Sequence, residues 1–578
     1  MAAPGPIVSP VDHESSGRVT WPAVILLGAV TIVVLLPFLG KALHIDDPLF
    51  VWSAQQIHRS PLDFYGFDVN WYGHPEPMAD VTQNPPGASY FLALSAMVLG
   101  WSETALHGAF LIPALAVTIG TMFLARRFCS RPLLAGVCVI ATPVFMMSGT
   151  VLTSDLVMLA FWTWAIELWL RGHEQRSPIV FAGSALLVAA AALTKYFAVA
   201  LIPLLLVDAW VRGRRRAMIW MVLPAVVLGL YELATRSLYG HGLLSQAGGY
   251  TRYIAKLDQA TAIAPLGKAL VGFVFFGGCT FLVLLLAPWL WTRTQLVIGS
   301  IVALLASLSA SAADDLYGFP MTDADGFKWW IIVHLFVFLA AGLGTLGLPC
   351  VRLLRAPSAD SLLLGLWVLG TFLFAAVLNW TVNGRSVLPA VPAVAILLVQ
   401  RLDRHVRAGK KRIAHAAIAA GLLVALAVAW ADLRHANTAR EAADRATEYD
   451  GGSTDRIRYQ GHWGFQWYME QHGARALNLN SPVLTRGEFV VLPGNNTEVR
   501  ELPRQGARLL ERLELPTTRW VSTMSPFEGT GYYAARKRGP LPFALRPTTP
   551  ERYYVYRVIR NINHPSRPAG ASNGGSAH

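Results

Sequence analysis

Long apolar segments separated by short polar loops dominate the first three quarters of this 578-residue sequence. Each of these segments has close to the roughly twenty apolar residues that a helix needs to cross a lipid bilayer. The pattern therefore predicts a mainly α, polytopic membrane protein with about thirteen transmembrane helices. We place these helices at residues 21–40, 104–126, 132–148, 153–171, 178–194, 196–211, 217–235, 266–291, 294–311, 328–350, 361–380, 387–402 and 413–431.

One apolar segment, from Gly87 to Gly100, is too short to cross a bilayer. We expect it to form a re-entrant or interfacial helix. The stretch from Phe50 to His58 has its apolar positions spaced as in a short helix that lies along the membrane surface, with Trp52 at the level of the lipid headgroups. Both predicted helices belong to one polar loop, residues 41–103, that follows the first transmembrane helix.

The pattern changes near residue 432, where strand-like runs at residues 488–492 and 552–559 stand among scattered Gly and Pro. These runs predict a small α/β domain over residues 432–562. Residues 461–470 form an aromatic-rich segment that we interpret as a helix. This helix either docks on the membrane domain or fills the core of the small domain.

A membrane domain covering residues 21–431 completes the expected organisation. The terminal segments 1–20 and 563–578 are polar and rich in Pro, Gly and Ser, which predicts disordered tails. No small-residue cleavage site follows the first apolar segment, so we interpret that segment as a retained helix and not as a signal peptide.

Composition and charge fit a membrane protein and exclude other classes. Hydrophobic residues make up 54% of the chain and charged residues 14%, which excludes a soluble protein. The net charge of +13 does not indicate a nucleic-acid partner, because the Lys and Arg residues lie in short loops between apolar segments. This distribution matches the positive-inside rule and predicts a multi-pass protein of the inner (plasma) membrane with a cytoplasmic N-terminus. In that orientation the loop 41–103 and the domain 432–562 are both extracytoplasmic.

The cysteines give no sign of a disulfide framework or a zinc site. Cys129, Cys138, Cys279 and Cys350 lie in or beside apolar segments and have neither CxxC nor Cys/His spacing. No paired DxD element argues for a catalytic metal either. We therefore expect neither a metal nor another cofactor.

Two adjacent carboxylates, Asp46 and Asp47, follow the first apolar segment directly. Acidic groups so close to a membrane are costly unless they are used or well solvated, which makes the pair a candidate functional site. The alternative is a solvated pair without a role. The loop that follows suits the binding of a sugar or a headgroup, and Tyr65 and His74 are our substrate-binding candidates in it. Its polar and aromatic residues are Asp63, Tyr65, Asp68, Trp71, Tyr72, His74 and Glu76.

The same loop resembles the first outer loop of the GT-C glycosyltransferases. The resemblance rests on the acidic pair, the interfacial helix behind it, and the Pro85-Pro86 motif that opens the run Tyr90-Phe91-Leu92-Ala93-Leu94. The most similar families are the protein O-mannosyltransferases and the aminoarabinose transferases that modify lipid A. The resemblance covers residues from about 20 to 400 and implies a GT-C type membrane domain.

Further residues match motifs of these families. Asp155, in Thr153-Ser154-Asp155, resembles an acidic element of the second outer loop, although it could also serve only as a helix N-cap. Lys195 resembles the Lys of a Leu-Thr-Lys-Gly element taken to meet the donor phosphate; the alternative is a snorkelling anchor. Arg385 resembles the Arg of an Arg-Tyr-Leu-Leu-Pro element and suits a phosphate. Asn84 stands where many relatives have Lys, so the donor headgroup contacts differ there.

The resemblance implies an inverting transfer of a sugar from a polyprenyl-phosphate carrier to an envelope glycolipid, polysaccharide or protein at the outer face of the membrane. Asp46 is then the base, Asp47 orients the acceptor or shares that role, and Asp155 assists. The substrate-binding candidates are Lys195, Arg385, Asn84, His74 and Tyr65. A transporter or lipid flippase is the alternative, since such proteins also place charges within the membrane. A non-catalytic scaffold is a third hypothesis.

Overall fold

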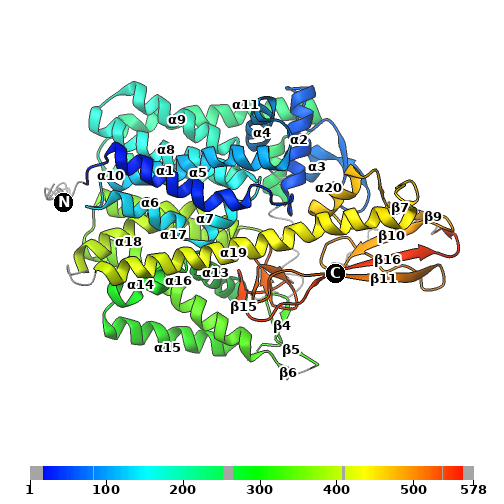
Figure 1. The fold of residues 1–578 in the computed structure, drawn as a ribbon. Helices are drawn as coiled ribbons and strands as arrows, with labels where there is room; N and C mark the ends of the chain where they lie inside the picture. The colour runs from blue at the N-terminus through cyan, green and yellow to red at the C-terminus, as the bar shows by residue number, and fades with distance from the viewer. Residues whose placement is uncertain are drawn as a thin grey trace.

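The computed structural model describes residues 17–82, 84–250, 265–310, 313–324, 326–405, 411–536 and 538–563. Within these residues the chain forms a helical bundle, with a polar loop and a small sheet at one end of it (Figure 1). The predicted fold class, a mainly α membrane protein with a small α/β region near the C-terminus, is confirmed. Of the predicted tails, residues 1–16 and 564–578 lie outside the described residues.

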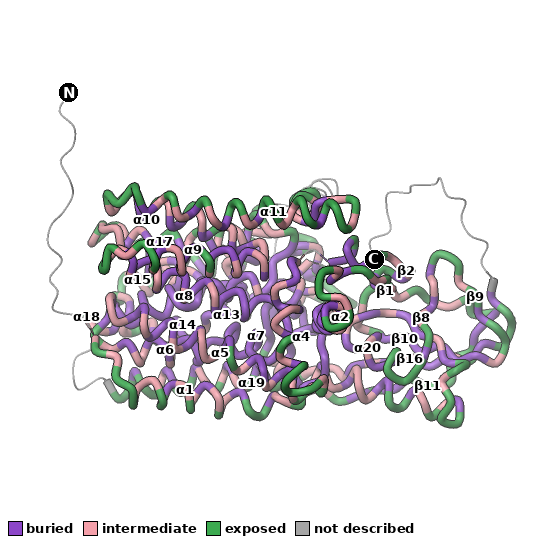
Figure 2. Tube along the Cα trace, turned by 90° about the horizontal axis from the view of Figure 1, so that it is seen from above, coloured by how far each residue is buried: buried purple, intermediate pink, exposed green. Residues whose placement is uncertain are grey.

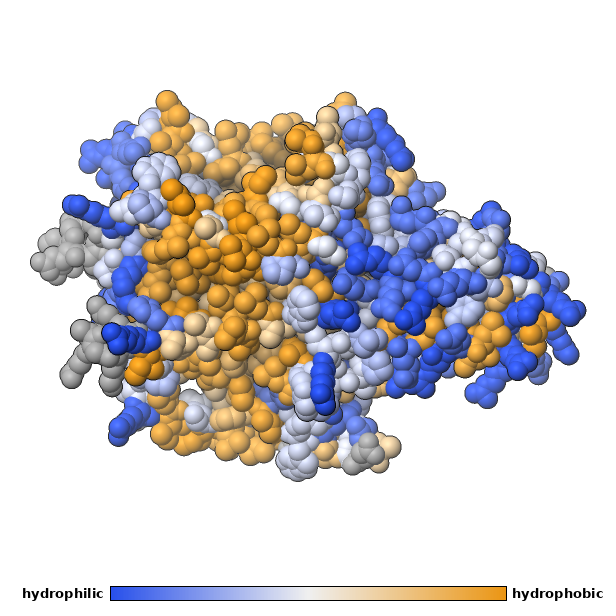
Figure 3. Space-filling view, viewed as in Figure 1, coloured by the Kyte–Doolittle hydropathy of each residue, from blue (hydrophilic) through white to orange (hydrophobic). Residues whose placement is uncertain are grey.

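The bundle helices run in roughly one direction, and their apolar side chains form a broad band on the molecular surface (Figures 1 and 3). Helix α8 is buried along most of its length, whereas α1 and α15 expose large apolar side chains to the surroundings (Figure 2). The helical segments of the bundle are α1 (Trp21–Leu35), η2 (Leu36–Phe38), α5 (Glu103–Ala125), α6 (Pro132–Ile140), α7 (Pro143–Ser148), α8 (Ser154–Gln175), α9 (Pro178–Ala192), η3 (Tyr196–Ala200), α10 (Leu201–Val211), η4 (Arg215–Met221), α11 (Val222–Tyr239), α13 (Pro265–Cys279), α14 (Leu282–Leu290), α15 (Arg293–Ala310), α16 (Trp329–Arg355), α17 (Ala359–Leu373), η5 (Phe374–Leu378), η6 (Arg385–Ala390), α18 (Val391–His405) and α19 (Lys411–Ala446).

In the described part of the chain, eight helical segments are long and apolar enough to cross a membrane. A ninth arises if α13 and α14, which are bent by 84° at their junction, form one span. These nine correspond to predicted spans. The other four predicted spans are helices that are shorter, broken or more polar, namely α6 with α7, α8, α9, and η3 with α10. The chain is therefore a multi-pass membrane protein, while the number thirteen stays a prediction.

The first polar loop, residues 41–103, contains the two short helices expected from the sequence. Helix α2 (Asp47–Arg59) begins with an acidic residue followed by Pro48, which favours a helix N-terminus. Helix α4 (Gly87–Leu99) packs against α2, and Gly100 ends it with a φ of 89°. The loop also contains a hairpin and one helical turn, made by β1 (Asp68–Asn70), β2 (Pro75–Pro77) and α3 (Met78–Val81).

Helix α19 joins the bundle to the C-terminal region (Figure 1). Its 36 residues give a length of about 54 Å, which exceeds the roughly 30 Å of hydrocarbon in a bilayer. The C-terminal turns therefore extend beyond the bundle. The expected domain boundary at residue 432 lies inside this helix, and where the small domain begins stays a prediction.

The C-terminal sheet has the strand order β11-β16-β10-β7-β8. Strand β10 pairs antiparallel with β16 and parallel with β7, so that Val491 lies opposite both Val555 and Tyr459. The central strand is buried along its whole length, which explains why its sequence is continuously apolar. The strands of this region are β7 (Ile457–Tyr459), β8 (Arg475–Ala476), β9 (Val483–Leu484), β10 (Phe489–Pro493), β11 (Ala507–Leu515), β12 (Val521–Ser522), β13 (Met524–Ser525), β14 (Thr530–Gly531), β15 (Ala544–Leu545), β16 (Glu551–Val558) and β17 (Ile562–Asn563).

Helix α20 (Trp463–Gln471) contacts both the sheet and the first polar loop. The ring of Phe465 lies 5.3 Å from that of Tyr553 on β16, and the hydroxyl of Tyr468 accepts a hydrogen bond from the Leu43 N–H at 2.8 Å. Both arrangements expected for this aromatic segment therefore hold. Outside these regions, short strands β3 (Asp315–Leu316), β4 (Phe319–Pro320), β5 (Thr322–Asp323) and β6 (Gly326–Phe327) form two hairpins before α16.

Basic loops meet at the opposite end of the bundle. Arg131 pairs with Asp403 at 2.6 Å, and Arg212 pairs with Asp360 at 2.5 Å, so loops distant in sequence lie together there. The molecule thus has one end with the basic loops and another with the first polar loop and the sheet. Both ends are hydrophilic, and the apolar band lies between them (Figure 3). Which of the two ends faces the cytoplasm stays a prediction.

Candidate functional site

A cavity of about 980 Å³ lies where the bundle, the first polar loop and the C-terminal region meet. Its wall on the bundle side is largely apolar and comes from η3, α10, α17 and η5. Three residues of this wall, Val207, Leu366 and Leu378, are also exposed on the apolar surface of the bundle. The lining of the cavity therefore includes residues of the surface that a membrane would cover.

The two adjacent carboxylates of the first polar loop have different surroundings. Asp46 lines the cavity, and its side chain is 28% exposed. Asp47 is fully buried, and its carboxylate accepts hydrogen bonds from the backbone N–H groups of His44 (2.9 Å) and Leu152 (2.8 Å). Burial raises the pKa of Asp47 to about 7. Asp46 is thus accessible to a ligand, whereas Asp47 fixes the backbone behind it.

The segment that carries Asp46 is tightly held by α20. A Cβ atom on Gly464 would meet the Leu43 carbonyl oxygen at 1.9 Å, so the two backbones approach more closely than a side chain allows. Ile45 has a φ of 48°, which a β-branched residue adopts only under strain. Such strain persists where the surrounding structure fixes the backbone. The position of Asp46 is therefore set by α20 together with the first polar loop.

Arg385, the first residue of η6, lies beside Asp46 in the cavity wall. Its Nη2 donates a hydrogen bond to Asp46 Oδ2 at 2.8 Å, and its guanidinium lies 5.6 Å from the centre of the Tyr533 ring. Its buried Nε–H has no hydrogen-bond partner in the part of the chain that the structure describes. Because a guanidinium has five N–H donors, Arg385 can hold Asp46 and still donate to a ligand.

Lys195, which follows α9, lines the same cavity. Its Nζ lies 2.5 Å from Oδ1 of Asp155, a buried residue in the first turn of α8. The Asp155 carboxylate also accepts a hydrogen bond from Thr153 Oγ1 at 3.2 Å. Asp155 is close enough to Arg385 for their charges to interact. We call Asp46, Arg385, Asp155 and Lys195 the cavity cluster.

The remaining binding candidates are divided between the cavity and the surface. Tyr65 and Asn84 line the cavity, and the Tyr65 hydroxyl donates to the Asn84 carbonyl oxygen at 2.8 Å. His74 lies outside the cavity lining, with its Nε2 at 2.6 Å from Glu76 Oε1, so a role in binding stays a prediction. Of the predicted site residues, the structure brings together Asp46, Asp155, Lys195, Arg385, Tyr65 and Asn84, with Asp47 directly behind them.

Sequence reasoning missed the wall that the C-terminal region contributes. Trp463, Tyr533 and Arg538 all line the cavity. Trp463 opens α20 with a φ of 62°, and the guanidinium of Arg538 lies 4.7 Å above its ring. The aromatic segment 461–470 was a signal for this wall. No sequence signal indicated that Arg538 belongs to this wall, because its neighbours in space come from distant parts of the chain.

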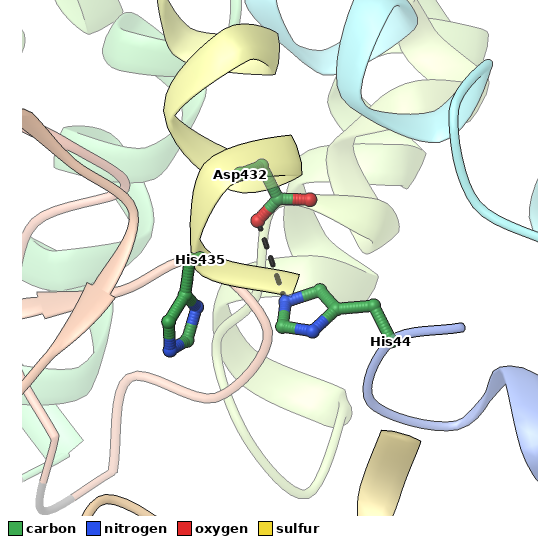
Figure 4. Close-up of side chains that lie close together, drawn as sticks. All are labelled: His44, Asp432 and His435. Atoms are coloured by element: carbon green, nitrogen blue, oxygen red, sulfur yellow. Dashed lines mark ion pairs between the residues drawn. The ribbon is translucent and has the colours of Figure 1, made fainter. Parts of the chain in front are cut away.

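A second group of ionisable residues, three of which are drawn in Figure 4, lies outside the cavity lining. His44 Nε2 lies 3.5 Å from Asp432 Oδ1, and Lys41 Nζ lies 2.5 Å from Asp432 Oδ2. His435, one turn further along α19, places its Nε2 at 3.2 Å from Glu551 Oε1. We call these five residues the sealed cluster.

The three side chains drawn in Figure 4 could in principle hold a metal ion, since their ligand atoms lie within 4.8 Å of one another. Asp432, however, already accepts hydrogen bonds from Tyr533 (2.6 Å) and Thr523 (3.1 Å) in addition to Lys41. A divalent ion would also lie beside the buried Lys41 ammonium, and like charges repel strongly in a low-dielectric interior. The arrangement therefore fits an ion-pair network better than a metal centre.

Comparison with known sequences gives one family. Residues 83–239 match the family described as dolichyl-phosphate-mannose-protein mannosyltransferase. This stretch includes Asp155 and Lys195, but neither Asp46 nor Arg385. No curated protein matches the chain. The family match confirms the resemblance to the protein O-mannosyltransferases, and hence to the GT-C glycosyltransferases, that the sequence indicates.

Comparison with solved structures gives weaker likenesses. The chain is 12% identical to the oligosaccharyltransferase of Archaeoglobus fulgidus crystallised with a tethered acceptor peptide, with a TM-score of 0.46 over 79% of this chain and 64% of that one. It is 13% identical to ArnT from Cupriavidus metallidurans bound to undecaprenyl phosphate, with a TM-score of 0.47 over 82% and 94% of the two chains. It is 14% identical to the arabinofuranosyltransferase AftD from Mycobacteria, with a TM-score of 0.36 over 95% and 40%. The chain thus spans 64% of the length of the first of these proteins.

Proposed function

We propose that this protein transfers a sugar from a polyprenyl-phosphate carrier to a hydroxyl or phosphate group of an envelope glycolipid, polysaccharide or protein. The observation that carries the proposal is the shared cavity, which combines a carboxylate, three cations and an apolar wall that includes residues of the membrane-facing surface. These are the parts that displacement at an anomeric carbon requires when the leaving group is a lipid phosphate.

Asp46 acts as the general base in this proposal. As the acceptor oxygen attacks the anomeric carbon, its proton passes to the Asp46 carboxylate. At the same time the bond between the anomeric carbon and the phosphate oxygen breaks, so the anomeric configuration is inverted. Support for this choice comes from the access of Asp46 to the cavity and from its hydrogen bond to Arg385, which orients the carboxylate.

Lys195 and Arg385 stabilise the departing phosphate in this proposal. Each cation already pairs with a carboxylate, but Arg385 retains an unused Nε–H, and a Lys ammonium has three donors. A phosphate can therefore join the cluster without breaking the contact between Arg385 and Asp46. ArnT from Cupriavidus metallidurans has been crystallised with undecaprenyl phosphate, which makes this lipid the first carrier to test.

The site faces the outside of the inner membrane in this proposal. Support comes from the position of the basic loops, which lie at the end of the bundle opposite to the cavity. Positively charged loops are retained on the cytoplasmic side of membranes.

Mass spectrometry of envelope glycolipids, polysaccharides and glycoproteins tests the proposal. Cells without the protein should lack one sugar residue on one class of glycan, and the wild-type chain should restore it. A chain that carries both Lys195→Met and Arg385→Met should reach the membrane at the wild-type level and fail to restore the sugar. Identical glycans with and without the protein would overturn the proposal.

A further inference from the structure

Arg538 differs from the other two cations that line the cavity. Lys195 and Arg385 each pair with a carboxylate, at 2.5 Å and 2.8 Å. Among the described residues, Arg538 has no ion pair. Its Nη1 donates to Asn495 Oδ1 at 2.5 Å and its Nη2 to the Asn496 carbonyl oxygen at 3.0 Å, and both of these acceptors are neutral.

The surroundings of Arg538 leave its charge only partly compensated. Burial lowers the pKa of Arg538 to about 10, although the charge of Glu551 acts in the opposite direction. A guanidinium that is withdrawn from water without a carboxylate partner costs free energy in the unliganded protein. An anion that enters the cavity would remove this cost, so the position of Arg538 favours an anionic ligand.

The groups around Arg538 suit a saccharide. Its guanidinium lies 4.7 Å from the centre of the Trp463 ring. A guanidinium has five N–H donors, so Arg538 keeps donors for a ligand besides the two N–H groups that bind Asn495 and Asn496. Asn496 links Arg538 to His462, whose ring stacks on Trp71 at 5.1 Å and 19°. Trp463 and Trp71 both line the cavity, as do Tyr72 and Thr497. Flat aromatic surfaces, hydroxyl groups and a guanidinium together match a sugar that carries an acidic group.

We propose that Arg538, Trp463 and Trp71 form a second anion subsite of the cavity, which binds a phosphate or carboxylate on the acceptor saccharide. This inference rests on the proposed function, which assigns the donor phosphate to Lys195 and Arg385. The assignment to the acceptor follows from the two walls of the cavity. The apolar wall that suits a lipid chain belongs to η3, α10, α17 and η5 of the bundle, whereas Arg538 belongs to the wall that the C-terminal region contributes.

Ligand-induced changes in the melting temperature of the purified full-length protein test the subsite. The probes are glucose 6-phosphate, glucose and undecaprenyl phosphate, with ionic strength matched by NaCl. Glucose 6-phosphate should raise the melting temperature of the wild type in a saturable way, whereas glucose should not. Arg538→Gln should weaken the response to glucose 6-phosphate by about tenfold or more, the effect of losing a charge-assisted contact. Its response to undecaprenyl phosphate should stay unchanged.

Two further variants make the test specific. Arg538→Lys keeps the charge and should retain part of the response, which also covers the case in which Arg538→Gln does not fold. Arg546→Gln is the matched control, because this residue lies over Trp330 at 3.9 Å and is not part of the cavity lining. No response of the wild type to glucose 6-phosphate, or an equal response of Arg538→Gln, would overturn the subsite. A response to glucose 6-phosphate without one to undecaprenyl phosphate would instead contradict the proposed donor.

Discussion

The cavity cluster and the sealed cluster both pair acidic with basic side chains and lie close together, but the side chains of their main ion pairs differ in exposure. The side chains of Asp46, Lys195 and Arg385 are 28%, 23% and 14% exposed. Those of Lys41 and Asp432 are 0% exposed, although they form an equally short ion pair. Solvent and ligands therefore reach Asp46, Lys195 and Arg385, but not the pair of Lys41 and Asp432.

This difference in exposure indicates that one cluster stabilises the structure and the other binds ligands. The pair of Lys41 and Asp432 joins residues 391 positions apart, and Asp432 also binds Tyr533 of the C-terminal region. The pair is closed to a substrate, and it joins the segment that carries Asp46 to α19 and the C-terminal region. The cavity cluster keeps the access that binding and proton transfer require. Its role therefore depends on ligands, and that of the sealed cluster on stability.

Breaking the sealed cluster should give the largest change in stability. Asp432→Asn leaves the Lys41 ammonium buried without a carboxylate, which should lower the free energy of unfolding by about 3–5 kcal/mol. Asp46→Asn removes a partly exposed pair and should cost about 1 kcal/mol or less. Thermal melting of both variants in the same detergent measures the contrast. Equal losses would remove the distinction between the two clusters.

Neutralising the cations of the cavity cluster should weaken donor binding. Lys195→Met and Arg385→Met should each reduce the affinity for undecaprenyl phosphate by about 1.5–3 kcal/mol, the scale of a charge-assisted hydrogen bond. Since both groups are proposed to bind one phosphate, their effects should not add in the double mutant. Isothermal titration measures the cycle, with Lys328→Met as a control outside the cavity lining. Strict additivity would contradict a shared phosphate.

The buried carboxylate Asp47 should make stability depend on pH. Its pKa of about 7 is raised above that in the unfolded chain, so the folded state binds more protons between about pH 4 and 7. The contribution of Asp47 is therefore full below about pH 4 and is lost as the pH rises through 7. His44, with a pKa lowered by burial to about 4, acts in the opposite direction in the same window.

The comparison of wild type with Asp47→Asn isolates the Asp47 contribution, because His44 is present in both proteins. Subtracting the pH profile of the variant from that of the wild type should leave a stability difference that falls as the pH rises from 4 to 7. Melting temperatures across this range give the profiles. A flat difference would show that the pKa of Asp47 is the same in the folded and the unfolded chain.

Local patterns were sufficient to predict many elements of the fold. Apolar segments predicted the long helices and α4, the spacing of apolar positions predicted α2, and strand-like runs predicted β10 and β16. The patterns could not predict the 84° bend between α13 and α14, since hydropathy reports burial and not direction. They also missed that α19 continues to Ala446, because its last turns leave the membrane and lose the apolar signal.

The candidate site was only partly predictable for a related reason. Asp46, Lys195 and Arg385 stand at boundaries of apolar segments, where a charge is unusual enough to be noticed. Nothing in the sequence distinguished the access of Asp46 from the burial of Asp47. The partners of Lys41 and Arg538 come from distant segments, so no local pattern contains them.

The most direct test of the account is the rate of sugar transfer by Asp46→Asn in reconstituted membranes, measured beside its binding of undecaprenyl phosphate. Asp68→Asn, which changes an exposed carboxylate of the same loop, is the control. The account predicts a rate about 10² to 10⁴ times lower for Asp46→Asn, as expected for loss of a general base, with donor binding and melting temperature close to those of the wild type. A wild-type rate in Asp46→Asn would contradict it.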